Sequence, residues 1–94
     1  MAEVIVYSTA FCPYCVRARM LLDSKAVTYH EIRVDLEPQY RRQMEQKSAR
    51  TSVPQIFIDD LHIGGFTELY ALECNGELDL LLDSGNKAPK DIQA

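Results

Sequence analysis

Apolar residues follow two different periods along the chain, and the alternation between these periods predicts the order of the elements. Residues 3–8 (EVIVYS) are β-branched and aromatic and precede a polar turn, as in a short buried strand. From residue 13 to about residue 25 the period becomes helical. One stripe of this helix gathers four apolar residues, Cys15, Ala18, Leu21 and Leu22. Val16 and Met20 form a second, smaller patch, which predicts a helix covered on two sides.

The middle of the chain continues the alternation with a strand, a helix and a hairpin. Residues 27–34 are again strand-like. Pro38, which a first helical turn tolerates, predicts the start of a helix that ends near residue 48. Residues 55–59 and 61–63 form two short strands separated by an acidic turn, which predicts a hairpin.

The last part of the chain is predicted to be helical. Gly64 and Gly65 interrupt the pattern, and Thr67 is expected to cap a helix that runs to Cys74. A glycine follows that helix, and residues 77–83 (ELDLLLD) read as one last short helix. Residues 85–94 have the composition of a tail, so the domain is predicted to span residues 1–84.

The order strand, helix, strand, helix, hairpin, helix predicts an α/β fold. Two strands joined by a helix should lie parallel, with a right-handed crossover between them. The hairpin then adds two antiparallel strands to the same sheet. We therefore expect a mixed four-stranded sheet flanked by helices.

The composition of the chain argues against nucleic acid binding and against insertion into a membrane. The chain has 94 residues, enough for one domain, and a formal net charge of −4, so it lacks the dense basic surface that nucleic acid binding requires. No apolar run approaches the ~20 residues that span a bilayer, and the N-terminus does not read as a signal peptide. We expect a cytoplasmic monomer that binds neither nucleic acid nor membranes. In that reducing compartment paired cysteines are more often catalytic or metal-binding than structural.

Two cysteines form a C-x-x-C pair at the junction between the first strand and the first helix. Cys12 falls at the N-cap position, with Pro13 at the first helical position. Backbone N–H groups without helical partners, together with the positive end of the helix, favour a thiolate at Cys12. Cys15 lies one turn later on the apolar stripe, within disulfide range. The pattern predicts Cys12 as a nucleophile and Cys15 as a resolving thiol.

A metal site is the main alternative for such a pair. Structural zinc needs about four ligands. The remaining candidates, Cys74, His30 and His62, fall in different predicted elements, so we expect no bound metal. Cys74 has no pairing partner in the sequence pattern and is expected to pack as a small apolar group.

Three motifs give the chain a family resemblance. CPYC after the first strand, TSVPQIFID before the hairpin turn and HIGGFTELYAL after it resemble the dithiol glutaredoxins, closest to the bacterial glutaredoxin 3 type. The resemblance spans about residues 3–83. It implies a thioredoxin fold and reduction of glutathione mixed disulfides and protein disulfides. It also implies glutathione as co-substrate, with ribonucleotide reductase among the candidate protein partners.

The resemblance further implies which residues hold glutathione. A cis peptide bond before Pro54 would face the nucleophile and leave the backbone of Val53 free to pair with the tripeptide, as a strand would. The segment Gly65, Phe66, Thr67 and Glu68 would bind the γ-glutamyl end. There, backbone N–H groups would hold the carboxylate and the Glu68 side chain would pair with the ammonium.

Three further positions complete the implied site. Arg41 would contact the glycine carboxylate from the second helix, and Tyr14 would stack over the ligand or shield the sulfurs. Thr9 departs from the family pattern, because relatives commonly carry lysine three residues before the nucleophile. With Thr9 there, the helix N-terminus has to stabilise the thiolate largely alone.

Two other functions stay open at this point. One is an iron–sulfur cluster carrier, in which two subunits each lend Cys12 to a cluster and glutathione completes the ligands. Pro13 and a resolving Cys15 make that use less common among relatives. The other is a disulfide reductant recharged by thioredoxin reductase instead of glutathione, against which the implied clamp residues argue.

Overall fold

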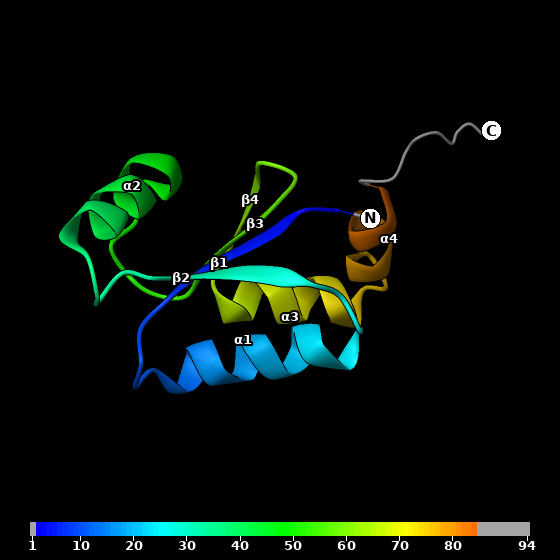
Figure 1. Ribbon diagram of the computed structural model, residues 1–94. Coiled ribbons are helices and arrows are strands. Elements are labelled where there is room, and N and C mark those ends of the chain that lie inside the picture. The colour runs from blue at the N-terminus through cyan, green and yellow to red at the C-terminus, as the bar shows by residue number, and fades with distance from the viewer. Residues whose placement is uncertain (1, 85–94) are drawn as a thin grey trace.

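The computed structural model describes residues 2–84 and contains a four-stranded mixed sheet flanked by helices (Figure 1). The elements in chain order are β1 (Val4–Ser8), α1 (Pro13–Ser24), β2 (Tyr29–Arg33), α2 (Pro38–Ser48), β3 (Gln55–Ile58), β4 (Leu61–Gly64), α3 (Phe66–Cys74) and α4 (Leu78–Ser84). The predicted α/β fold and the order of its elements are confirmed. Residues 85–94, the predicted tail, lie outside the described residues.

The strand order explains where a site can form. The sheet runs β2-β1-β3-β4, with β1 parallel to β2 and antiparallel to β3. Because β1 and β3 are antiparallel neighbours, the end of β1 and the start of β3 lie at the same edge of the sheet. The segment after β1, which contains Cys12, therefore meets the segment before β3, which contains Val53 and Pro54.

The two faces of the sheet carry separate hydrophobic clusters. Alternate residues of β1 point to opposite faces, so Val4 and Val6 face α1 and α3 while Tyr7 faces α2. The larger cluster also contains Leu22 of α1 and Leu69 of α3. A second group, Val34, Met44 and Phe57, packs with Tyr7 on the other face. The sheet is thus buried on both sides.

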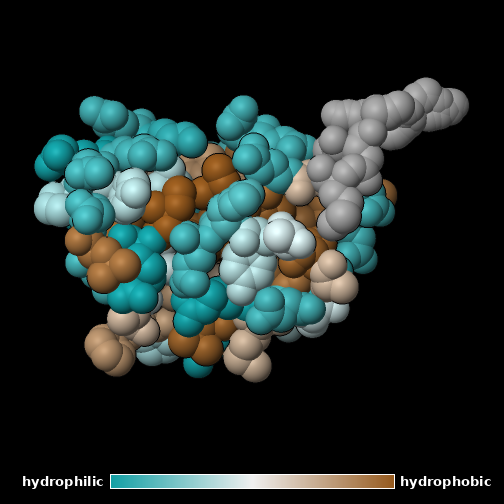
Figure 2. Space-filling model, viewed as in Figure 1, coloured by the Kyte–Doolittle hydropathy of each residue, from teal (hydrophilic) through white to brown (hydrophobic). Residues whose placement is uncertain are grey.

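Helix α2 is largely exposed. Among its described residues only Met44 and Ser48 are buried. Figure 2 shows hydrophilic side chains over the α2 region at the upper left of this face, and hydrophobic side chains gathered nearer its middle. No helix within residues 2–84 is long and apolar enough to cross a membrane.

The hairpin turn is formed by its two acidic residues. Asp59 and Asp60 have φ values of 51° and 68°, so both adopt the left-handed conformation that a two-residue hairpin of type I′ requires. Aspartate tolerates this conformation better than most side chains. The predicted acidic turn is confirmed.

Two predictions about packing are wrong. Val16 and Met20 are 40% and 65% exposed, because α3 lies beside α1 in the same layer and leaves the outer side of α1 to solvent (Figure 1). Cys74, expected to pack as a small apolar group, is exposed at the end of α3. Its sulfur instead pairs with the Tyr70 hydroxyl, which raises the pKa of Tyr70.

Candidate active site

Cys12 takes the N-cap position of α1, as the sequence predicts. Its backbone is extended (φ −112°, ψ 114°), and Pro13 begins the helix. The backbone N–H of Cys15 donates to the Cys12 sulfur at 3.4 Å. The Cys12 sulfur therefore accepts a backbone N–H from the first turn of α1, where such groups have no partner within the helix.

Cys15 occupies a different environment only one helical turn away. Cys12 is partly exposed, whereas Cys15 is fully buried. Burial raises the pKa of the Cys15 thiol from 9.0 to about 11, the hydrogen bond with Cys12 adds to the rise, and the backbone of Thr9 opposes it. Cys15 is therefore a neutral thiol near pH 7, so the two sulfurs differ in both access and protonation.

The segment before β3 forms the wall opposite Cys12. The peptide bond between Val53 and Pro54 is cis, as the family resemblance implies. The thiol of Cys12 donates to the carbonyl oxygen of Val53 at 3.7 Å. This contact joins residues 41 positions apart and brings the C-x-x-C pair to the cis proline.

Two residues without a predicted role, Gln55 and His62, stabilise the segment before β3 through hydrogen bonds. Gln55 is fully buried, and its amide nitrogen donates to the Ser52 carbonyl oxygen at 3.0 Å. His62 of β4 donates from Nε2 to the Gln55 side-chain oxygen at 2.7 Å. The sequence does not predict these hydrogen bonds, because a polar residue at the start of a strand is common.

The start of α3 forms the third side of the site. Gly65, not the predicted Thr67, is the N-cap, and Thr67 lies inside the first turn. Glu68 explains the difference, because its carboxylate accepts a hydrogen bond from the Gly65 N–H at 2.7 Å and so closes the helix one residue before Phe66. Gly64 has φ +120°, and a Cβ there would lie 2.8 Å from the Glu68 carboxylate oxygen.

A groove of about 240 Å³ connects these three segments. Its lining brings together most of the predicted glutathione-binding residues: Tyr14, Val53, Pro54, Gly65, Phe66, Thr67 and Glu68. Arg50 also lines it and was missed by sequence reasoning. Arg50 directly precedes the motif TSVPQIFID, which begins at Thr51, so the motif gave no signal for it.

Arg41 lies outside this groove. It lines a neighbouring hollow on α2, with Pro38 and Arg42. Its guanidinium donates to the Thr51 carbonyl oxygen at 2.9 Å. Arg41 therefore supports the loop that carries Ser52 and Val53 from the side of α2.

Three aromatic rings extend from α1 along α3. The ring centroids of Tyr14 and Phe66 are 6.5 Å apart, and Phe66 stacks on Tyr70 at 5.7 Å. The guanidinium carbon of Arg17 lies 5.4 Å from the Tyr14 ring centroid. Tyr14 is thus held at the groove between Phe66 and Arg17.

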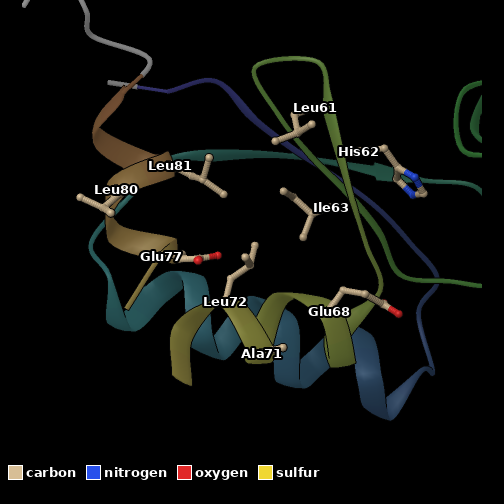
Figure 3. A pocket seen from close by; sticks show the side chains of 9 residues that line it. All are labelled: Leu61, His62, Ile63, Glu68, Ala71, Leu72, Glu77, Leu80 and Leu81. Carbon is tan, nitrogen blue, oxygen red and sulfur yellow. The ribbon is translucent and has the colours of Figure 1, made fainter. Parts of the chain in front are cut away.

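A larger groove of about 660 Å³ lies away from the cysteines, between β4, α3 and α4 (Figure 3). Aliphatic side chains form most of its lining, among them Leu61, Ile63 and Leu72. Glu68 borders both grooves. Within residues 2–84 no group of three or more His, Cys, Asp or Glu side chains could hold a metal ion.

Comparison with known proteins identifies the family to which this geometry belongs. The family model described as glutaredoxin matches residues 4–63. The chain belongs to the glutaredoxin family. Glutaredoxin 3 of Escherichia coli strain K12 is 51% identical over 82 residues, which cover 87% of this chain and 99% of that protein. A glutaredoxin of Pseudomonas aeruginosa is 46% identical over 84 residues, covering 89% of this chain and 100% of the relative.

The fold comparison agrees with the family. A crystal structure of a buckwheat glutaredoxin–glutathione complex superposes with a TM-score of 0.80 at 28% identity, over 86% of this chain and 76% of the other. Like its structural neighbours, this glutaredoxin has the thioredoxin fold. It is a thiol–disulfide oxidoreductase.

Proposed function

We propose that this glutaredoxin uses glutathione to reduce glutathione mixed disulfides and protein disulfides, with Cys12 as nucleophile and Cys15 as resolving thiol. The observation that carries the proposal is the unequal pair of sulfurs. Cys12 is reachable and accepts the Cys15 N–H at 3.4 Å, whereas Cys15 is buried and its pKa is raised to about 11. A nucleophilic sulfur must be accessible to its substrate, and of the two sulfurs only that of Cys12 is accessible.

With a glutathionylated target, the proposed reaction needs only Cys12. The Cys12 thiolate attacks the glutathione sulfur of the mixed disulfide, a new S–S bond forms, and the target leaves as a thiolate. A second glutathione thiolate then attacks the glutathione sulfur on Cys12. Oxidised glutathione leaves, and Cys12 returns to the thiolate.

With a protein disulfide, the proposed reaction also needs Cys15. Cys12 attacks one sulfur of the substrate and releases the other as a thiolate. The Cys15 sulfur then attacks the Cys12 sulfur and leaves a Cys12–Cys15 disulfide, while the second substrate sulfur departs and takes up the proton that Cys15 loses. Two glutathione molecules reduce that disulfide in turn, and burial of Cys15 keeps it protonated until the intermediate has formed.

Glutathione is proposed to bind in the 240 Å³ groove. The backbone of Val53, beside Pro54, would pair with the tripeptide, while Tyr14 and Phe66 flank it. The backbone N–H of Thr67 would donate to the γ-glutamyl carboxylate, and Glu68, which already accepts the Gly65 N–H, would receive the ammonium. The buckwheat relative, solved as a glutathione complex, supports this placement by its fold.

Arg41 is proposed to reach the glycine carboxylate from α2. Its guanidinium already lies at the Thr51 carbonyl, next to the loop that lines the groove. The proposed protein partners are glutathionylated or disulfide-containing proteins of the cytoplasm, and ribonucleotide reductase is a candidate among them. The enzyme is proposed to act as a monomer. The comparisons do not favour the iron–sulfur carrier, which would need Cys12 from two chains.

Two cysteine variants test the proposed function in a glutathione-coupled assay with hydroxyethyl disulfide. Cys12→Ser should abolish turnover. Cys15→Ser should keep turnover of glutathione mixed disulfides, lose reduction of protein disulfides, and trap a glutathione adduct visible by intact mass. Equal behaviour of the two variants, or turnover that does not depend on glutathione, would contradict the assigned roles.

A further inference from the structure

Strand β4 forms one edge of the sheet, and its outer side is not paired with another strand within residues 2–84. On the inner side, the Asp59 N–H donates to the Glu3 carbonyl oxygen at 2.9 Å. Hydrogen-bonded pairs recur at every second residue of an antiparallel ladder, so Phe57 of β3 also directs its N–H and C=O toward β1. Phe57 lies opposite His62 of β4. The backbone N–H and C=O of His62 therefore point away from β3, toward the outer edge of the sheet.

The larger groove of about 660 Å³ begins at this edge (Figure 3). Leu61, His62 and Ile63 of β4 all line it, so the unpaired backbone and the groove are continuous. Ile63 and Leu72 of α3 point toward each other across the groove in Figure 3. Leu61 and Leu80 are 52% and 67% exposed. Exposed aliphatic side chains next to an open strand edge are typical of a surface that another chain covers.

An extended peptide satisfies both features of this surface. A strand added beside β4 would lie about 4.8 Å from it and could exchange hydrogen bonds with the His62 backbone. Side chains alternate along a strand, so every second one would enter the groove toward Ile63 and Leu72. A helix in the groove would bury the edge without pairing the N–H and C=O of His62, which costs free energy. The geometry therefore favours a strand.

The charges of the groove favour a basic partner. Glu68 and Glu77 line it, and no lysine or arginine of residues 2–84 does. Glu68 has the Arg50 guanidinium 3.6 Å away, whereas Glu77 forms no ion pair within the described chain. Burial lowers the pKa of His62, so its ring is neutral at pH 7. Two copies of this chain joined through β4 would bring like charges together, which disfavours self-association.

We propose that the outer edge of β4 and the larger groove bind an extended segment of a partner protein, which adds a fifth strand to the sheet. The segment carries apolar residues at alternate positions and lysine or arginine between them. This binding surface goes beyond the proposed function and does not depend on it, because no cysteine takes part. A partner held there would lie next to the groove beside Cys12, since Glu68 borders both grooves.

A synthetic peptide tests the proposal without thiol exchange. The probe is acetyl-KVKLTVK-amide. One control peptide, acetyl-EVELTVE-amide, reverses the charge, and a second carries N-methyl groups on two adjacent backbone amides, those of its leucine and threonine, so that it cannot pair as a strand. The proteins are wild type, Glu77→Gln and Leu80→Ser, with the matched controls Glu37→Gln and Met20→Ser. Both control positions are exposed and lie outside the larger groove.

The probe should bind the wild type, and each control peptide should bind at least about tenfold more weakly. Glu77→Gln should weaken the probe about two- to fivefold, the range of an exposed ion pair, and Leu80→Ser by a similar factor. The two control variants should bind it like the wild type. Titrations followed by NMR give the dissociation constants. Exchange of the His62 backbone N–H with solvent should be fast in the free protein and slow down on saturation with the probe.

Absence of binding at millimolar probe overturns the proposal, and so does equal binding of the charge-reversed peptide. Unchanged exchange of the His62 N–H at saturation also overturns it, because the peptide then does not pair with β4. The free protein distinguishes two other occupants by the same measurement. Slow exchange at every protein concentration would assign the edge to residues 85–94 of the same chain. Slow exchange that appears only at high protein concentration would assign it to a second copy, and either result overturns the proposal.

Discussion

At the scale of single residues, environment separates two side chains of the same type. Cys12 and Cys15 are three positions apart, yet one is reachable at a helix N-terminus and the other is fully buried. The sequence predicts this division because the C-x-x-C spacing and the apolar stripe of α1 are local features. Arg50 could not be found in this way, since its partner Glu68 lies 18 positions along the chain and is near only in the folded state.

The raised pKa of Cys15 predicts a specific pH dependence of stability. The neutral thiol is favoured by burial, so its contribution is complete below the unfolded value of 9.0 and is lost as pH rises through about 11. Across that window the unfolding free energy of the reduced protein should fall by about 2 kcal/mol more than that of Cys15→Ala. Urea unfolding under reducing conditions measures both proteins, and parallel pH profiles would contradict the prediction.

At the scale of elements, the first turn of α3 combines a structural task with a proposed binding task. Glu68 accepts the Gly65 N–H and so sets the residue at which the helix begins. The predicted cap at Thr67 was wrong because threonine is the better intrinsic cap, whereas the reach of Glu68 back to Gly65 depends on the chain path after β4. The predicted second buried patch of α1 failed for a similar reason. Periodicity marks apolar residues, but α3 decides which side of α1 is covered.

Two substitutions at Glu68 separate these tasks. Glu68→Ala removes the acceptor of the Gly65 hydrogen bond and should lower the unfolding free energy by about 1 kcal/mol. Glu68→Gln keeps an oxygen that can accept this bond, so its stability should stay near that of the wild type. Both variants lack the carboxylate and should weaken S-methylglutathione binding alike. Equal stability of the two variants, measured by urea unfolding, would show that the hydrogen bond does not stabilise the helix start.

At the scale of the whole molecule, the relative directions of the strands were predictable from the sequence, but their order across the sheet was not. Alternating periods and the crossover rule led to two parallel strands and an antiparallel hairpin, as observed. That β1 lies beside β3 follows from packing of the whole sheet, and it is this neighbour relation that brings Cys12 to Val53. Family resemblance, not periodicity, anticipated the cis bond at Pro54.

The proposed domain limit at residue 84 can be examined by truncation. Helix α4 contributes the buried side chains of Leu78 and Leu82, and the backbone N–H of Ala2 donates to the Leu82 carbonyl oxygen at 3.0 Å. A chain ending after residue 84 should keep its unfolding free energy within about 0.5 kcal/mol and its turnover unchanged. A chain ending after Asn75 should lose cooperative unfolding, because two core leucines are missing. Thermal melts compare the three chains, and a destabilised 1–84 chain would place the limit further on.

The groove beside Cys12 is assembled from α1, the loop before β3 and the start of α3, segments that the unfolded chain keeps apart. Any molecule that occupies it binds the native state alone and must shift the folding equilibrium by mass action. At one hundred times its dissociation constant, such a molecule adds about 2.7 kcal/mol to the stability of the fold. The melting temperature should therefore rise with the logarithm of its concentration. A substitution that destabilises the sheet, even far from the groove, increases the fraction of unfolded protein. Because unfolded protein cannot bind the ligand, the apparent affinity for the ligand should then fall.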